Sequence, residues 1–254
     1  MEAAVTVAPG VQVRVFQDGE SLSRAAAEFI VAAAKQAVAE KGRCAVALSG
    51  GSTPKRLYSL LGSQPYRETV PWPQVHVFWS DERCVPPDHI ASNFKLASDA
   101  FLSKIPLPAA NIHRIRGEEG PGKAARSYEE DLKSFFGSGV PSFDLVLLGA
   151  GEDGHTASLF PGSPALEERE RISLPVYLER PQYDRVTLTL PVLNHALQVI
   201  FLATGRAKSE VVSAILEENN PQRFPAGLVR PQNGAISWFL DREAAMQVRA
   251  PLSA

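Results

Sequence analysis

Apolar residues in this 254-residue chain follow two alternating patterns. Short apolar runs are typical of strands buried inside a sheet, and apolar positions that recur at spacings of three and four residues are typical of amphipathic helices. The apolar runs predict strands over residues 11–16, 43–48, 75–79, 143–148, 185–190, 198–203 and 235–240, with a further short strand over residues 111–115.

Helical periodicity fills the intervals between these strands. Over residues 21–41 the apolar positions fall on one face, Asp18 or Ser21 stands where an N-cap is expected, and Gly42 follows the end. Further helices are predicted over residues 54–62, 93–102, 121–136 and 241–248. A short helix is predicted to begin at Pro191, and another follows Lys208 and ends at about Glu218. The charged, proline-containing segment 167–183 is expected to be a surface excursion.

Strands and helices that alternate in this way predict βαβ units with right-handed crossovers. The resulting sheet is mostly parallel and carries helices on both faces, which makes an α/β fold of three layers. Because the sequence has no internal repeat, low-complexity tract or linker, residues 1–254 are expected to form a single α/β domain.

Composition narrows the range of functions. Hydrophobic residues make up 44% of the chain and charged residues 21%, which are ordinary values for a globular protein. The net charge of −2, without any basic stripe, argues against nucleic acid or a membrane surface as a partner. A small anionic ligand needs only a local cluster of cations. No apolar run approaches the ~20 residues of a membrane span.

Cysteine usage and the N-terminal residues bear on localisation. Cys44 and Cys84 lack the CxxC spacing and are expected to be reduced thiols. The first residues resemble neither a signal peptide nor a transit peptide. We therefore expect a cytoplasmic protein that is a monomer or a weak homo-oligomer.

The first candidate binding site is the run Ser49-Gly50-Gly51-Ser52-Thr53, which lies between a predicted strand and the helix that Pro54 begins. Glycines let backbone amides approach a ligand closely, and a helix start adds unpaired amides and the positive end of its dipole. Two nearby hydroxyls complete a turn that suits a phosphate group. Taken alone, the run is more simply a tight turn with a hydroxyl cap, and it matches neither a Walker loop nor a dinucleotide fingerprint.

Charged residues stand near the ends of other predicted strands. The planar guanidinium of Arg83 suits a bidentate contact with phosphate, and Asp81 or Glu82 is placed to hold Arg83 in position. Lys208 is a second candidate cation and Arg185 a third. Isolated basic residues are usually just solvated, but three of them near the edges of the sheet and beside a glycine-rich turn favour a shared anion site.

His155 is the candidate acid–base residue. It follows a strand and the glycine-rich loop 149–154, which includes Gly151, and in open α/β sheets such loops border the ligand. Asp153 is two residues away and could orient the imidazole ring and fix its tautomer. The alternative interpretation is an aspartate that caps a helix and a histidine that only packs.

The sequence lacks the motifs of serine esterases and of common metal sites. The GxSxG elbow of serine esterases is absent, so no serine nucleophile is expected. HExxH and Cys/His pairs at metal-ligand spacing are absent too, and therefore neither a metal nor another cofactor is expected.

Taken together, these motifs resemble those of the 6-phosphogluconolactonases. The resemblance extends over essentially the whole chain, and its motifs are Ser49-Gly50-Gly51-Ser52, Asp81-Glu82-Arg83, Gly149-x-Gly-x-Asp153-Gly154-His155-Thr156-Ala157-Ser158-Leu159-Phe160-Pro161 and Arg185-Val186-Thr187-Leu188-Thr189. It implies a Rossmann-like fold and the hydrolysis of 6-phospho-D-glucono-1,5-lactone to 6-phospho-D-gluconate, in the oxidative branch of the pentose phosphate pathway. It also implies water activation by His155.

Glucosamine-6-phosphate deaminases are the main alternative, because they share the SGG turn, the Asp-Glu pair and an Asp-Gly-His loop. Their loop continues to a glutamate that assists ring opening through the histidine, where this chain has Phe160. Their Asp-Glu pair is followed by tyrosine, where this chain has Arg83. Both differences favour the lactonase. A non-catalytic sugar-phosphate-binding protein with the same pocket remains a third interpretation.

Overall fold

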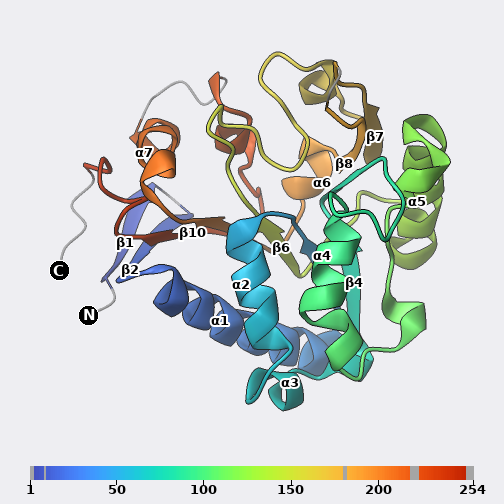
Figure 1. Ribbon diagram of the computed structural model, residues 1–254, viewed down its shortest axis with the longest axis horizontal. Coiled ribbons are helices and arrows are strands. Elements are labelled where there is room, and N and C mark those ends of the chain that lie inside the picture. Colours follow the sequence, from blue (N-terminus) through green and yellow to red (C-terminus); the bar gives the residue numbers. More distant parts are fainter. Residues whose placement is uncertain (1–2, 9, 180–181, 218–222, 250–254) are drawn as a thin grey trace.

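The computed structural model describes residues 3–8, 10–179, 182–217 and 223–249, and within them the larger sheet has its strands in the order β1-β2-β10-β9-β6-β3-β4. All of these strands run parallel to their neighbours except β1, which is antiparallel to β2 (Figure 1). Their bounds are β1 (Ala3–Ala8), β2 (Val11–Phe16), β3 (Cys44–Leu48), β4 (Val75–Trp79), β6 (Leu145–Leu148), β9 (Gln198–Ala203) and β10 (Ala235–Asp241).

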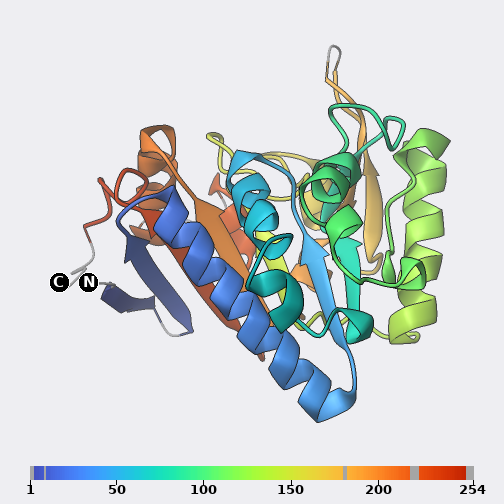
Figure 2. The same cartoon turned by 60° about the horizontal axis from the view of Figure 1, so that its bottom comes forward.

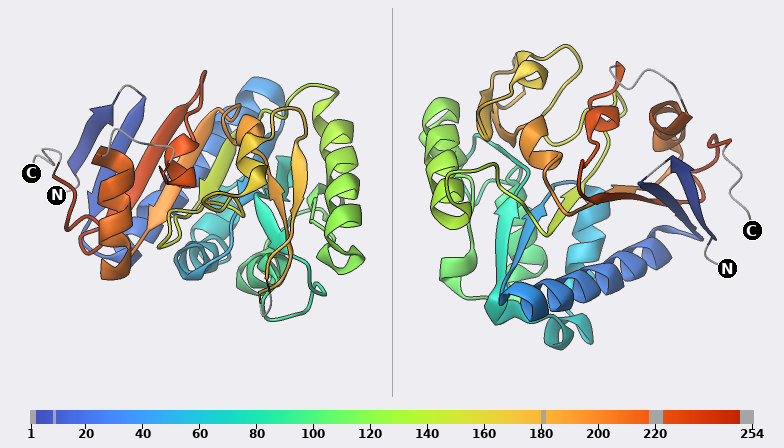
Figure 3. Two further views of the ribbon diagram at one scale, coloured as in Figure 1. Left: turned by 90° about the horizontal axis from the view of Figure 1, so that it is seen from above. Right: turned by 180° about the vertical axis from the view of Figure 1, so that it is seen from behind.

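Helices cover both faces of this sheet. On one side lie α1 (Gly19–Lys41), α2 (Ser52–Leu61), α3 (Tyr66–Thr69) and α4 (Asn93–Ala100), as Figure 2 shows. On the other side lie α6 (Leu190–Leu193) and α7 (Ser209–Glu217), and α5 (Pro121–Phe136) stands beyond β4 (Figure 3). The predicted α/β fold with a mostly parallel, helix-covered sheet is confirmed. No helix among the residues described here is both long enough and apolar enough to cross a membrane.

The ends of α1 follow the signals in the sequence. The Asp18 carboxylate accepts hydrogen bonds from the backbone amides of Glu20 and Ser21, at 3.1 and 2.8 Å. Gly42 ends the helix with a φ of 74°, a conformation that glycine adopts without strain. For α7, the predicted end at Glu218 lies outside the described residues.

A smaller antiparallel sheet has the order β5-β8-β7, with β5 (Asp81–Arg83), β8 (Arg185–Leu188) and β7 (Ser173–Val176). It lies beside α5 (Figure 1). The strand predicted over residues 185–190 therefore exists but lies outside the parallel sheet. The expectation of a mere surface excursion over residues 167–183 is wrong, because Ser173 and Val176 are buried in β7.

Two other predicted elements do not form. Residues 111–115 make only an isolated bridge from Ile112 to Val77, and the Asn111 side chain donates instead to the backbone carbonyls of Pro73 and Val75. In the segment 241–248, Asp241 ends β10 and residues 242–247 form turns instead of a helix. The carboxylate of Asp241 does not begin a helix there. It accepts hydrogen bonds from the backbone amides of Gly205 and Ala244.

Four neighbouring strands, β9, β6, β3 and β4, bring their carboxyl ends to one edge of the larger sheet. The chain passes from β3 to β4 on one side of β3, whereas β6 and β9 lie on the other side. Such a reversal of strand order opens a crevice at the carboxyl edge, which is where α/β proteins bind ligands.

Candidate active site

A cavity of about 240 Å³ lies at this carboxyl edge. Its wall includes every predicted site residue except Asp153, namely Ser49, Gly50, Gly51, Ser52, Thr53, Asp81, Arg83, Gly151, His155, Arg185 and Lys208. Asp153 does not line this cavity, but its carboxylate contacts His155. The structure therefore brings together residues that follow three strands of the larger sheet, β3, β6 and β9, and residues of the smaller sheet.

The turn from Ser49 to Thr53 connects β3 to α2. Gly51 is the N-cap of α2, with a φ of 117°, and no side chain in the described part of the chain makes a capping hydrogen bond to this helix start. The amides of the first helical turn have no partner within the helix, so those of Ser52 and Thr53 are available to a ligand. The hydroxyl of Tyr58 pins the turn, because it donates to the Ser49 carbonyl (2.7 Å) and accepts from the Ser49 amide (3.1 Å). The alternative of a hydroxyl cap is wrong.

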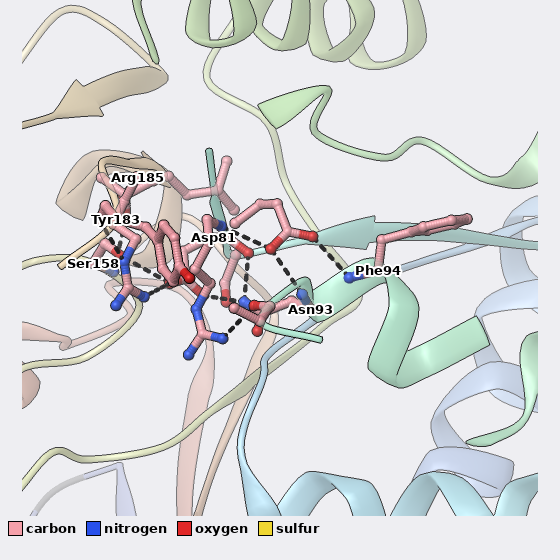
Figure 4. Close-up of polar contacts among 12 residues, drawn as sticks. Asp81, Asn93, Phe94, Ser158, Tyr183 and Arg185 are labelled. Atoms are coloured by element: carbon pink, nitrogen blue, oxygen red, sulfur yellow. Dashed lines mark hydrogen bonds and ion pairs between the residues drawn. The ribbon is translucent and has the colours of Figure 1, made fainter. Parts of the chain in front are cut away.

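Arg83 and Arg185 occupy paired positions in the β5–β8 ladder. Burial lowers the pKa of Arg185 and the nearby charge of Arg83 lowers it further, while Asp81 opposes the change. Asp81 Oδ2 lies 3.9 Å from Arg185 Nη1, and Arg83 instead donates to the carbonyl of Ala91 (2.6 Å). The expectation that Asp81 holds Arg83 is therefore wrong, and Asp81 faces Arg185 instead (Figure 4).

Lys208 adds a third positive charge from the segment that follows β9. Its ammonium group makes no hydrogen bond or ion pair with any residue that the structure describes. Two arginines that repel each other and one lysine without a carboxylate partner leave excess positive charge at the cavity. This arrangement suits an anionic ligand such as a phosphate group.

Glu82 serves the backbone instead of the cavity. One of its carboxylate oxygens accepts from the amides of Arg83 and Asn93, and the other accepts from the Phe94 amide and the Ser92 hydroxyl. Burial raises the pKa of Glu82, although these four donors oppose the shift. Glu82 thus fixes the start of α4, and its link to Arg83 is through the backbone amide only.

Asp81 fastens the histidine loop to β5. Its Oδ2 accepts a 2.6 Å hydrogen bond from the hydroxyl of Ser158, and its Oδ1 accepts a 3.2 Å hydrogen bond from Asn93 Nδ2 (Figure 4). The backbone amide of Ser158 donates in addition to the hydroxyl of Thr187 in β8. The loop that carries His155 is therefore anchored to both strands that carry the arginines.

His155 Nδ1 and Asp153 Oδ1 are 2.6 Å apart, and the same oxygen accepts from the His155 backbone amide at 3.1 Å. Partial burial raises the pKa of Asp153, but the hydrogen bonds from His155 outweigh that effect, so the pKa is lowered overall. A carboxylate at Nδ1 favours the tautomer with its proton on Nδ1, which leaves Nε2 free to accept one. Asp153 thus orients His155 and caps no helix.

Gly151 makes room for this pair. A Cβ atom at residue 151 would lie 2.1 Å from His155 Nδ1 and 2.5 Å from Asp153 Oδ1. The imidazole also packs against the ring of Phe160, with centroids 4.7 Å apart. The histidine that borders the cavity thus contacts both an aspartate and an apolar ring.

Sequence reasoning missed three polar residues of the site. Asn93 and Thr204 line the cavity, and Ser158 holds Asp81. The hydroxyl of Thr204 is 2.7 Å from that of Thr53, which joins the end of β9 to the start of α2. Thr204 directly follows a predicted strand, a position that could have marked it. Asn93 begins a helix, and its position in the sequence carries no such signal.

Comparison with known proteins places this geometry in a family. Residues 17–238 match the family of glucosamine-6-phosphate isomerases/6-phosphogluconolactonase. The chain belongs to this family. A 6-phosphogluconolactonase from a Synechocystis species is 40% identical over 243 residues, which are 94% of this chain and 98% of that protein. The human 6-phosphogluconolactonase is 40% identical over 252 residues, 96% of each chain.

Solved structures of the family have the same fold. The 6-phosphogluconolactonase of Trypanosoma brucei superposes with a TM-score of 0.83 at 31% identity, over 93% of this chain and 98% of that one. A monomeric glucosamine-6-phosphate deaminase superposes with a TM-score of 0.78 at 24% identity, over 92% and 99% of the two chains. The likeness to the deaminase is evidence of the shared fold only.

We predict that Glu82→Gln destabilises the protein by about 1–3 kcal/mol, because an amide NH₂ group would face backbone donors where an oxygen now accepts. Urea unfolding of the variant and the wild type measures this difference. Glu118→Gln is the matched control. It removes a partly exposed pair with Arg114, with closest atoms 2.6 Å apart, and is expected to cost less than about 1 kcal/mol. Equal losses in the two variants would refute the role given to Glu82.

Proposed function

We propose that this chain hydrolyses 6-phospho-D-glucono-1,5-lactone to 6-phospho-D-gluconate, a reaction of the oxidative branch of the pentose phosphate pathway. The observation that carries the proposal is His155, which Asp153 orients, on the wall of a cavity that is also lined by the basic side chains of Arg83, Arg185 and Lys208. Membership of the family, with relatives named 6-phosphogluconolactonase that are about 40% identical over nearly the whole chain, supports this reaction.

The phosphate group of the substrate docks, in this proposal, on the positive side of the cavity. Arg83, Arg185 and Lys208 supply the charge, and the amides of Ser52 and Thr53 at the start of α2 supply further donors. Holding the remote phosphate orients the lactone carbonyl, because binding energy from a non-reacting group positions the reacting one.

His155 is the proposed general base. Its Nε2 takes a proton from a water molecule as the water oxygen attacks C1 of the lactone. The carbonyl becomes a tetrahedral oxyanion, which amides of the 149–154 loop or a nearby cation would stabilise. The bond from C1 to the ring oxygen then breaks, and the ring oxygen takes the proton from the imidazolium. Asp153, whose lowered pKa keeps it ionised, stabilises the imidazolium in between.

The reaction needs no covalent nucleophile, metal or other cofactor, because a lactone is already a reactive ester. Among the described residues, no serine or cysteine side chain is hydrogen-bonded to the ring of His155. This contact pattern differs from that of a serine esterase, where the base activates a hydroxyl.

Phe160 argues against deamination of glucosamine 6-phosphate. Ring opening of that sugar requires a proton relay beside the histidine, and the side chain that packs on the His155 ring is an apolar phenylalanine. Lactone hydrolysis requires only one base that later returns its proton. A sugar-phosphate-binding protein without activity would not require a carboxylate that fixes the tautomer of the histidine.

We further propose a single α/β domain over residues 1–254 that works in the cytoplasm as a monomer or a weak homo-oligomer. Support for one domain comes from the buried apolar cluster, which runs from β2 through β10 and β6 to Val186 in the smaller sheet without a break. Light scattering of the purified protein measures its mass, and a stable tetramer or hexamer would contradict the proposal.

We expect His155→Ala to lower kcat for the lactone by about 10²- to 10⁴-fold, which is the usual contribution of a general base. Binding of 6-phosphogluconate, measured by calorimetry, should survive because the phosphate contacts remain. His195→Ala is the control, since His195 bonds to the Val140 carbonyl outside this cavity and its loss should leave kcat unchanged. Turnover of His155→Ala close to that of the wild type would refute the assignment.

Lys208→Met should raise KM for the lactone about tenfold or more with little change in kcat, because hydrogen bonds to charged groups contribute about 1.5–3 kcal/mol. Lys95→Met is the control, because Lys95 pairs with Asp99 (2.8 Å) on the surface of α4. Steady-state kinetics of both variants measures the effect. An unchanged KM in Lys208→Met would remove Lys208 from the phosphate site.

A further inference from the structure

Asn93 is a buried amide on the wall of the cavity for which the proposed mechanism has no role. It is the first residue of α4, its side chain is 2% exposed, and it lies between Asp81 and Phe94 (Figure 4). Its backbone amide donates to Glu82, so the start of the helix is fixed.

The orientation of the Asn93 side chain is determined by its neighbours. Nδ2 donates to the backbone carbonyl of Asp81 at 3.0 Å and to Asp81 Oδ1 at 3.2 Å. Both partners are acceptors, so the opposite orientation would set an oxygen against two oxygens. The Asn93 carbonyl oxygen, Oδ1, therefore points away from Asp81.

On that other side Oδ1 meets Gly50. It accepts no hydrogen bond from any residue that the structure describes. A Cβ atom at residue 50 would lie 1.9 Å from Oδ1 and 2.5 Å from Cγ, so only glycine leaves the Asn93 amide in place. A buried acceptor without a donor is destabilising, and a ligand donor in the cavity would satisfy it.

The chemistry of the ligand selects its donor. A phosphate dianion and a lactone carbonyl offer only acceptors, whereas each hydroxyl group on the sugar ring can donate. Two other buried polar atoms of residues that line the cavity, Ser49 Oγ and Arg83 Nε, also have no hydrogen-bond partner among the residues that the structure describes. The serine hydroxyl can rotate and the guanidinium nitrogen can only donate, so Asn93 is the acceptor of fixed direction among the three.

We propose that Asn93 Oδ1 accepts a hydrogen bond from a ring hydroxyl of the substrate and thereby selects phosphorylated sugar lactones that carry this hydroxyl. The inference rests on the proposed lactone hydrolysis and adds to it a specificity-determining residue. Gly50 is part of the same arrangement, because a side chain at residue 50 would displace the Asn93 amide from its position. The basic side chains at the phosphate site bind one end of the substrate, and Asn93 accepts a hydrogen bond from a hydroxyl group on its ring.

The test uses the 6-phospho-1,5-lactone and its 2-deoxy, 3-deoxy and 4-deoxy analogues. For each compound kcat/KM is divided by the rate constant of spontaneous hydrolysis, which removes differences in intrinsic reactivity. With the wild type, one deoxy analogue should be about 5- to 30-fold poorer than the parent lactone, the range expected for one hydrogen bond to a buried acceptor. With Asn93→Ala, the parent and that analogue should react equally well.

Ser92→Ala is the matched control. Ser92 precedes Asn93, donates to Glu82 and caps α4, but it does not line the cavity. Its loss disturbs the same helix start and should leave the discrimination against the deoxy analogue intact. If Asn93→Ala and Ser92→Ala both keep the wild-type ratio, Asn93 has a structural role only and the inference is overturned.

The wild type alone decides the matter should Asn93→Ala fail to fold. If the wild type hydrolyses the parent lactone and all three deoxy analogues at the same normalised rate, the inference is overturned and the proposed function stays intact. Absence of any catalysed hydrolysis of the parent lactone would overturn both. One poorer analogue in the wild type supports the role of Asn93.

Discussion

The buried carboxylate of Asp81 joins the separate segments that make the cavity. It accepts from Ser158 of the histidine loop and from Asn93 at the start of α4, and it faces Arg185 of the smaller sheet. A buried carboxylate is costly unless such partners surround it, and removal of one partner leaves the others without theirs. The relative placement of the base and the cations therefore depends on this residue.

The same arrangement explains how a chain of net charge −2 can hold an anionic substrate. Arg83 and Arg185 are neighbours across the β5–β8 ladder. The carboxylate of Glu82, which precedes Arg83 in sequence, is already occupied by three backbone amides and the Ser92 hydroxyl. Positive charge is concentrated where the amides at the start of α2 also face the cavity. A phosphate group relieves the repulsion between the arginines, and so these residues suit a bound ligand better than an empty site.

Much of the site could be predicted from the sequence, because parallel strands end at a common edge. The turn Ser49–Thr53, Lys208 and His155 all follow strands of the larger sheet, and that alone gathers them. The partners of Asp81 could not be predicted in this way. Arg185 faces Asp81 because β5 pairs with β8, and Asn93 and Ser158 come from a helix start and a loop. A short apolar run does not specify which sheet it joins.

The role of Asn93 was likewise hidden, since it depends on a close approach to Gly50 from another element. The secondary structure predicted for residues 111–115 and 241–248 was wrong for a related reason. In both segments a polar side chain, Asn111 or Asp241, takes over hydrogen bonds that a strand or a helix would have supplied. Apolar periodicity carries no information about such contacts.

The central claim is that this cavity hydrolyses a phosphorylated lactone and does not deaminate an amino sugar. The most direct measurement follows 6-phospho-D-glucono-1,5-lactone by NMR with and without the protein, with glucosamine 6-phosphate as a parallel substrate. We predict that the protein accelerates decay of the lactone to 6-phosphogluconate and leaves glucosamine 6-phosphate unchanged. Lactone decay at the spontaneous rate, or release of ammonia from the amino sugar, would contradict this account.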